Sequence, residues 1–210
     1  MPGSSLAWAY IAGVKGALFV RHGESEYSVA LRLNGDAAVD VGLTERGREE
    51  ARRLAEELSG TEIDLCVTSA LRRTQETADI ALAGRHVPRL VVPELNDPRY
   101  GRFEGATLEE YRAWADHAPS AARPSDDGES RVEIVARYAR ALRLLLERDE
   151  RVIAVVVHSL PIAYLLATRN GDLPRPRVPL VAHAAVHRFD AGELERAAAA
   201  LESWVAAPTW

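Results

Sequence analysis

Apolar and polar residues are distributed along the chain in blocks that predict strands separated by helices. Short apolar runs bounded by turn-forming residues are typical of buried strands. Residues 152–157 form the most continuous of these runs, which predicts a central strand buried on both faces. Pro88 favours an edge position for another strand, because proline cannot donate to a sheet ladder. The expected strands are residues 16–20, 63–67, 87–92, 152–157 and 184–189.

Between these runs, apolar residues recur with the three- and four-residue spacing of amphipathic helices. In one such segment Ala51, Leu54 and Leu58 fall on a single face. In another, Ser130 and Glu133 form a capping box, a common signal for a helix start. The expected helices are residues 44–58, 71–82, 107–115, 130–145, 161–170 and 194–205.

The alternation of strands and helices predicts an α/β protein. We expect a three-layer sandwich, in which a mostly parallel central sheet carries helices on both faces. The domain is expected at residues 16–210, after an N-terminal extension at residues 1–15 that is too short to span a bilayer. Residues 106–128 hold five carboxylates and two arginines, a net charge of −3, and predict a short acidic lid at about 106–129.

Composition excludes several classes of partner. The 210 residues carry 31 acidic and 26 basic side chains and a formal net charge of −5, so neither nucleic acid nor a membrane surface is expected as a partner. Cys66 is the single cysteine, which excludes an internal disulfide framework and suits a cytoplasmic location. No acidic cluster has the spacing of a metal site, so neither a metal nor another cofactor is expected. The oligomeric state stays open.

Arginines and histidines follow three of the predicted strands. Arg21 and His22 come directly after the first strand, Arg72 and Arg73 lie just beyond the second, and His158 follows the central strand. Because the carboxyl ends of parallel strands meet at one edge of a sheet, we expect these side chains to lie together. Helices that begin near the same edge add unpaired N–H groups. The edge is therefore suited to a phosphate.

Phosphate binding alone would need arginines and backbone N–H groups, but not two histidines at separate strand ends. A neutral imidazole can attack phosphorus and form a covalent phosphoryl-enzyme, while fixed cations stabilise the transferring oxygens. No glycine loop with a P-loop lysine is present, which disfavours a nucleotide triphosphatase. A carboxyl group is also needed, to protonate the leaving oxygen and then to activate water. The candidates are Asp97, Glu94 and Glu104.

Several segments, in this order and spacing, resemble the histidine phosphatase superfamily, also called phosphoglycerate mutase-like. They are Arg-His-Gly-Glu-Ser at 21–25, Leu-Thr-Glu-Arg-Gly at 43–47, Ser-Ala-Leu-Arg-Arg at 69–73 with Thr77, Tyr-Gly to Glu-Gly at 100–105, and His158. The resemblance runs from about residue 16 to about residue 190. It implies a phosphoglycerate mutase-like fold and phosphoryl transfer through a phosphohistidine.

The resemblance also implies roles for individual residues. His22 would be the nucleophile. Arg21, Arg73 and a protonated His158 would hold the phosphate. Asp97 falls at the position of the family's general acid, where a glutamate is usual, so its shorter side chain puts its reach in doubt.

Other positions depart from the family pattern. Ser28 replaces a common asparagine but still offers a hydroxyl to the phosphate, and Ser159 replaces a glycine but keeps its backbone N–H. Arg72, next to the family's arginine position, is expected to face outward. His183 stands where an asparagine is common, and the sequence gives no account of it.

Three functions are compatible with this pattern. They are a metal-independent phosphomonoesterase, a phosphoglycerate mutase and a non-catalytic phosphate-binding module. The family's mutases have a long basic insertion where residues 106–128 lie, and it binds a second acidic group of the substrate. Because this segment is short and acidic here, hydrolysis of a small phosphorylated substrate is favoured. The residues expected at the mouth of the site are Tyr27, Tyr100, Trp114 and Leu160.

Overall fold

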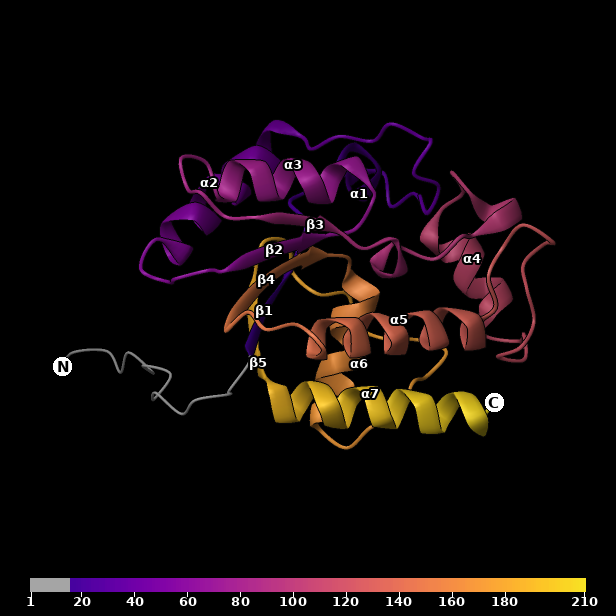
Figure 1. Ribbon diagram of the computed structural model, residues 1–210. Helices are drawn as coiled ribbons and strands as arrows, with labels where there is room; N and C mark the ends of the chain where they lie inside the picture. Colours follow the sequence, from indigo (N-terminus) through magenta and orange to yellow (C-terminus); the bar gives the residue numbers. More distant parts are fainter. Residues whose placement is uncertain (1–15) are drawn as a thin grey trace.

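The computed structural model describes residues 16–210, so the predicted extension at 1–15 lies outside the described residues. Within this range one five-stranded sheet has the order β3-β2-β4-β1-β5 (Figure 1). The strands are β1 (Gly16–Arg21), β2 (Leu65–Thr68), β3 (Arg89–Val91), β4 (Val152–Val157) and β5 (Val186–Asp190).

The pairing of the strands confirms the predicted sheet. β4 lies at the centre and pairs in parallel with β1 and β2, and β3 adds to β2 in parallel. β5 is antiparallel to β1 and forms the other edge. The strand after Pro88 is indeed at an edge, and the carbonyl of Pro88 accepts a hydrogen bond from the Cys66 N–H at 2.9 Å.

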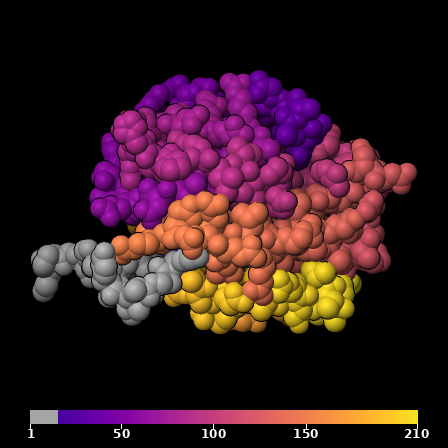
Figure 2. Space-filling model, in the orientation of Figure 1, coloured from indigo at the N-terminus to yellow at the C-terminus, as the bar shows by residue number. Residues whose placement is uncertain are grey.

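Helices cover both faces of the sheet, which confirms the three-layer architecture. α2 (Glu45–Leu58) and α3 (Arg72–Ala81) lie on one side, and α5 (Arg131–Leu146), α6 (Ser159–Arg169) and α7 (Ala191–Ala206) lie on the other (Figure 1). The space-filling view shows the same separation, with indigo and magenta segments above and yellow segments below (Figure 2). Two short helices, α1 (Glu26–Val29) and α4 (Leu108–Ala115), and the 3₁₀ turns Pro93–Leu95 and Gly101–Phe103 occupy the connections. Within residues 16–210, every helix is too short or too polar to cross a membrane.

The strands divide their side chains between two hydrophobic cores. In β1, Leu18 and Val20 pack with α2 and α3, whereas Ala17 and Phe19 pack with α5, α6 and α7. This division follows from the two-residue period of a strand. Because both faces are packed, the ends of β1, β2 and β4 are held at fixed positions.

Two boundaries near the C-terminus differ from the predicted ones. α7 begins at Ala191, earlier than the apolar spacing indicates, because Asp190 caps it and forms a capping box with Glu193. β5 begins later than expected, because Ala184 has a φ of 52° and leaves the extended conformation. The N–H of Ala184 instead donates to the carbonyl of Arg21 at 2.9 Å.

Candidate active site

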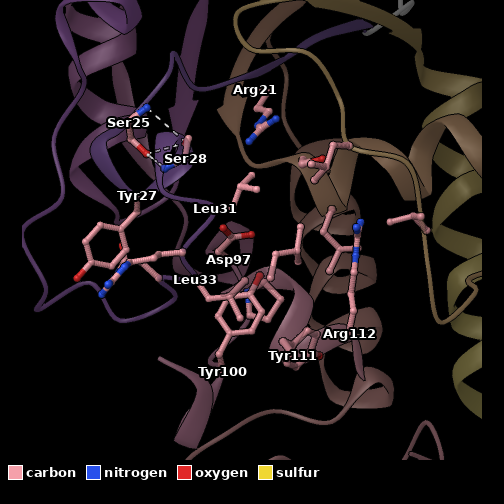
Figure 3. Close-up of a pocket in the computed structure, with 18 of the residues that line it drawn as sticks. Arg21, Ser25, Tyr27, Ser28, Leu31, Leu33, Asp97, Tyr100, Tyr111 and Arg112 are labelled. Carbon is pink, nitrogen blue, oxygen red and sulfur yellow. Dashed lines mark hydrogen bonds between the residues drawn. The ribbon is translucent and has the colours of Figure 1, made fainter. Parts of the chain in front are cut away.

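A pocket of about 140 Å³ lies at the carboxyl ends of the strands (Figure 3). Arg21 is the last residue of β1 and His22 follows it. Arg73 lies in the first turn of α3, just beyond β2, and His158 is the N-cap of α6, directly after β4. The structure therefore brings the predicted arginines and histidines to one edge of the sheet.

His22 is 3% exposed and its ring orientation is fixed. Its Nδ1 lies 2.7 Å from the carbonyl oxygen of Gly23, so we assign the proton to Nδ1 and the lone pair to Nε2. The Nε–H of Arg73 donates to that Nε2 at 3.2 Å. Burial, followed by the charges of Arg73 and Arg21, holds the pKa of His22 well below its usual range. These surroundings favour the neutral imidazole, with the Nε2 lone pair at the pocket.

Glycines permit a close backbone contact behind the nucleophile. A Cβ on Gly23 would lie 2.5 Å from the carbonyl oxygen of Gly47, and a Cβ on Gly47 would lie 2.0 Å from the carbonyl oxygen of Glu24. The hydroxyl of Thr77 accepts a hydrogen bond from the Gly23 N–H at 3.0 Å. Three motifs far apart in the sequence are therefore in contact, and two of them, which contain Gly47 and Thr77, support the loop that carries His22.

Arg73 connects the groups of the site. Its Nη2 donates to Asp97 Oδ2 at 3.0 Å and lies 3.3 Å from Nδ1 of His158. Asn34 fixes the guanidinium from the other side, since its Oδ1 and its carbonyl oxygen accept from Nη1 and Nη2 at 2.6 and 2.9 Å. Arg72, in contrast, is exposed and pairs with Asp40 at 2.6 Å. The structure thus places Arg73 at the pocket and Arg72 on the outside of α3.

His158 is fully buried and lies within reach of His22. Its Nε2 is 2.9 Å from the hydroxyl of Ser69, and its Nδ1 is 3.6 Å from Asp97 Oδ2. The two imidazole centroids are 5.3 Å apart. Burial, followed by the charge of Arg73, lowers the pKa of His158 well below its usual range. The expected protonated imidazole is therefore not what these surroundings produce: burial and nearby cations both oppose its charge.

Of the three candidate carboxylates, Asp97 lines the pocket (Figure 3). Glu104 instead accepts hydrogen bonds from two backbone N–H groups, and Glu94 does not line the pocket. Burial raises the pKa of Asp97, while the charge of Arg73 opposes that rise. The shorter aspartate side chain therefore reaches the pocket, and burial makes its carboxyl group easier to protonate than that of an exposed aspartate.

Arg21 carries an unsatisfied donor beside His22. Its Nη1 donates to the carbonyl oxygen of Val181 at 2.6 Å. Its Nε is buried and has no hydrogen-bond partner within residues 16–210. A buried donor without a partner costs about 1–3 kcal/mol. An anionic oxygen in the pocket would satisfy this group.

Two serines predicted to bind phosphate line the pocket, and each also has a structural contact. The hydroxyl of Ser28 lies 2.8 Å from that of Ser25, within the capping box of α1. The hydroxyl of Ser159 accepts from the Val181 N–H at 2.8 Å. Ser159 is the first residue of α6, where backbone N–H groups have no acceptor within the helix.

Asn34 is a residue that sequence reasoning missed, although it fixes Arg73. A Cβ on Gly35 would lie 1.7 Å from the carbonyl oxygen of Pro98, so glycine is required there for the loops to meet. This contact places Asn34 against the loop that carries Asp97. The one signal in the sequence is the Asn34-Gly35 pair, a common turn marker.

The segment predicted as an acidic lid presents a different face to the pocket. Its lining residues are Leu108, Tyr111 and Arg112, none of them acidic. None of its carboxylates lines the pocket: Glu110 caps α4, for example, and Asp116 pairs with Arg177. Net charge along a segment does not reveal which side chains face inward. Of the expected mouth residues, Tyr27, Tyr100 and Leu160 line the pocket, whereas Trp114 packs on the rings of Phe103 and Tyr111 outside it.

His183, unexplained by the sequence, packs against the nucleophile. The centroids of His183 and His22 are 5.7 Å apart, and Nε2 of His183 is buried with no partner within residues 16–210. Burial, followed by the charge of Arg21, lowers the pKa of His183 to about 4. A third neutral imidazole therefore borders the site.

The pKa of His183 predicts how stability depends on pH. An unfolded histidine binds a proton near pH 6.5, whereas folded His183 does so near pH 4. The unfolded state thus gains protons first, and stability falls as pH drops from 6.5 towards 4, by at most about 1.4 kcal/mol per pH unit from this residue. Thermal unfolding between pH 7 and pH 5 should show a shallower decline for His183→Asn than for the unsubstituted protein. His86→Asn, at an exposed site, is the matched control, and equal slopes for all three would contradict the assignment.

The sequence profile of the histidine phosphatase superfamily (branch 1) matches residues 17–204. The chain belongs to the histidine phosphatase superfamily. The predicted resemblance is confirmed, and the described residues extend over the whole matched region.

Members of this superfamily that resemble the chain include both phosphatases and mutases. An adenosylcobalamin/alpha-ribazole phosphatase of Escherichia coli is 35% identical over 103 residues, which are 45% of this chain and 50% of that protein. A 2,3-bisphosphoglycerate-dependent phosphoglycerate mutase of Haemophilus influenzae is 38% identical over 103 residues, 45% of this chain and 44% of that protein. The matches thus span about half the length of these curated relatives. A solved mycobacterial glucosyl-3-phosphoglycerate phosphatase superposes with a TM-score of 0.68 at 27% identity, covering 84% of this chain and 90% of that one.

Proposed function

We propose that this protein is a metal-independent phosphomonoesterase that acts through a phosphohistidine on His22. The observation that carries the proposal is the orientation of His22: its Nδ1 lies against the carbonyl oxygen of Gly23, and its Nε2 shares one pocket with Arg21, Arg73 and the carboxyl group of Asp97. This set contains a nucleophile, two cations for the transferring oxygens and a proton donor.

In the first step, Nε2 of His22 attacks phosphorus in line with the leaving oxygen. A phosphorus–nitrogen bond forms, the bond from phosphorus to the leaving oxygen breaks, and that oxygen keeps the electron pair. Protonated Asp97 gives its proton to this oxygen, so the product leaves as a neutral alcohol. The guanidinium groups of Arg21 and Arg73 stabilise the charge on the three equatorial oxygens.

In the second step, the same groups reverse their roles. The carboxylate of Asp97 takes a proton from a water molecule, and the oxygen of that water attacks phosphorus. The phosphorus–nitrogen bond breaks and its electron pair returns to Nε2 of His22, which releases inorganic phosphate. His158, whose Nδ1 lies beside Arg73 and Asp97, gains a proton more readily when a phosphate dianion lies against it, since an opposite charge favours the charged form.

A phosphoglycerate mutase is the second candidate. The similarity to curated mutases supports it, and so do arginines in the pocket wall that would suit an acidic substrate. Hydrolysis is favoured because residues 106–129 contribute one short helix to the pocket, α4, and no long insertion that would keep water from the phosphohistidine. A binding module without catalysis would have no need of His22 and Asp97 together.

A panel of phosphomonoesters tests the proposal. We expect release of inorganic phosphate from aryl phosphates and from several alkyl phosphates, unchanged by a chelator, because within residues 16–210 no three His, Cys, Asp or Glu side chains are grouped as metal ligands. The panel includes 3-phosphoglycerate with its bisphosphate cofactor. Isomerisation without net phosphate release would support the mutase, and binding without any turnover would support the module.

A further inference from the structure

Arg131, the first residue of α5, lines the pocket and has no carboxylate partner within residues 16–210. Its Nη1 donates to the hydroxyl of Tyr164 at 3.1 Å, and its Nη2 donates to the carbonyl oxygen of Pro176 at 3.4 Å. Both acceptors are neutral, and a guanidinium keeps its charge at any ordinary pH. The two contacts therefore fix the direction of the positive charge without neutralising it.

Other arginines at comparable positions have counter-ions. Arg137, on the same helix, pairs with Glu129 at 2.8 Å, and Arg177, in the same pocket wall, pairs with Asp116. Removing a charge from water without a counter-ion is unfavourable. An oriented, partly buried guanidinium that faces a pocket is therefore suited to an anionic ligand.

A continuous wall joins Arg131 to the phosphate-binding end of the pocket. Tyr100 follows Asp97 by three residues and lines the same pocket, and its ring contacts that of Tyr111 edge-on with centroids 5.1 Å apart. Tyr111 and Arg131 line this same pocket. Asp97, Tyr100 and Tyr111 all line the pocket (Figure 3). Since Asp97 stands beside the proposed leaving oxygen, the alcohol half of a substrate would lie along this wall.

Two further arginines in the pocket wall are positively charged, like Arg131. Arg32 and Arg112 also line the pocket, and within residues 16–210 neither has a carboxylate at ion-pair distance. Asp97 is the one acidic side chain among the described residues that line the pocket. The part of the pocket that receives the alcohol half is therefore cationic as well as aromatic.

We propose that Arg131, assisted by the hydroxyls of Tyr100 and Tyr111, binds a second anionic group on the alcohol half of the substrate. The preferred substrates are then phosphomonoesters that also carry a carboxylate or a second phosphate. This inference rests on the proposed function, because it takes the phosphate to be bound at Arg21, His22 and Arg73.

Matched substrate pairs test the second site. The first pair is 3-phosphoglycerate against glycerol 3-phosphate, which differ in a carboxylate. The second is a three-carbon diol with one phosphate against the same diol with two, which distinguishes a carboxylate from a phosphate as the second group. We expect the kcat/KM ratio of charged to neutral substrate to fall about 10- to 100-fold in Arg131→Met, since hydrogen bonds to charged groups have this strength. Arg131→Lys should restore part of the ratio.

Arg140→Met, at an exposed position of the same helix, is the matched control and should keep the original ratio. If Arg131→Met lowers kcat/KM equally for both members of a pair, Arg131 only ties α5 to its neighbours and the second site is refuted. If the unsubstituted protein hydrolyses phosphomonoesters without preference, the second site fails while the proposed function stands. If it hydrolyses none, the proposed function fails, and calorimetric binding of the same pairs to the protein and to Arg131→Met then decides on the second site.

Discussion

His22→Ala should lower kcat for every phosphomonoester by about 10⁴-fold or more, because removing a catalytic nucleophile removes the whole covalent route. The hydrogen bond from Nδ1–H to the carbonyl of Gly23 keeps Nε2 of His22 directed into the pocket. Arg73 also contacts His158, so within residues 16–210 His158 is the other imidazole beside this arginine. The measurement is steady-state release of phosphate. A second measurement is rapid quenching with ³²P-labelled substrate. The unsubstituted protein should acquire a phosphoryl label that is labile in acid and stable in alkali, and His22→Ala should not.

The matched control for this substitution is His86→Ala, because His86 is exposed and lies outside the pocket. It should retain both the rate and the label. Thermal unfolding of His22→Ala establishes that the variant is folded, since a truncated buried ring leaves a cavity. A folded variant that keeps most of its turnover, or that still acquires the label, would remove His22 from the proposed role.

Asp97→Asn should slow the release of poor leaving groups far more than that of good ones. General acid catalysis contributes about 10²–10⁴-fold when the leaving oxygen needs a proton. An alkoxide needs that proton and a 4-nitrophenolate hardly does. We therefore expect losses of about that size for alkyl phosphates, and a much smaller loss in the burst of 4-nitrophenol, which reports the first step alone.

The control for Asp97→Asn is Glu94→Gln, a nearby carboxyl group that does not line the pocket. Asp97→Asn also changes the acceptor of the 3.0 Å hydrogen bond from Nη2 of Arg73, so phosphate binding is measured in parallel. If alkyl and aryl phosphates lose equal factors in the first step, Asp97 only orients Arg73 or shapes the turn. The later hydrolysis of the phosphohistidine should slow in the variant for every substrate, because that step uses the same carboxylate as a base.

The position of Arg131 illustrates a limit of sequence reasoning. In the sequence this arginine follows a capping serine and looks like an ordinary exposed helix residue. Its lack of a counter-ion becomes visible once Tyr164 and Pro176 are in place around it. The predicted acidic lid shows the opposite case: its carboxylates stand out in the sequence, but none of those in residues 106–128 lines the pocket. The net charge of a segment does not show which of its side chains point into a pocket, and those side chains determine the electrostatics of the site.

The hydrophobic pattern alone predicts the order of strands and helices along the chain, the mostly parallel sheet and the edge at which Arg21, His22 and His158 meet. Local rules suffice there, because hydrophobic period sets the element type and parallel strands end at one edge. The packed chain shows, in addition, that Asn34 holds Arg73, that burial and nearby cations lower the pKa of His158, and that His183 borders the nucleophile. These contacts and pKa shifts depend on burial and on charges from distant segments, and both are set only when the chain folds.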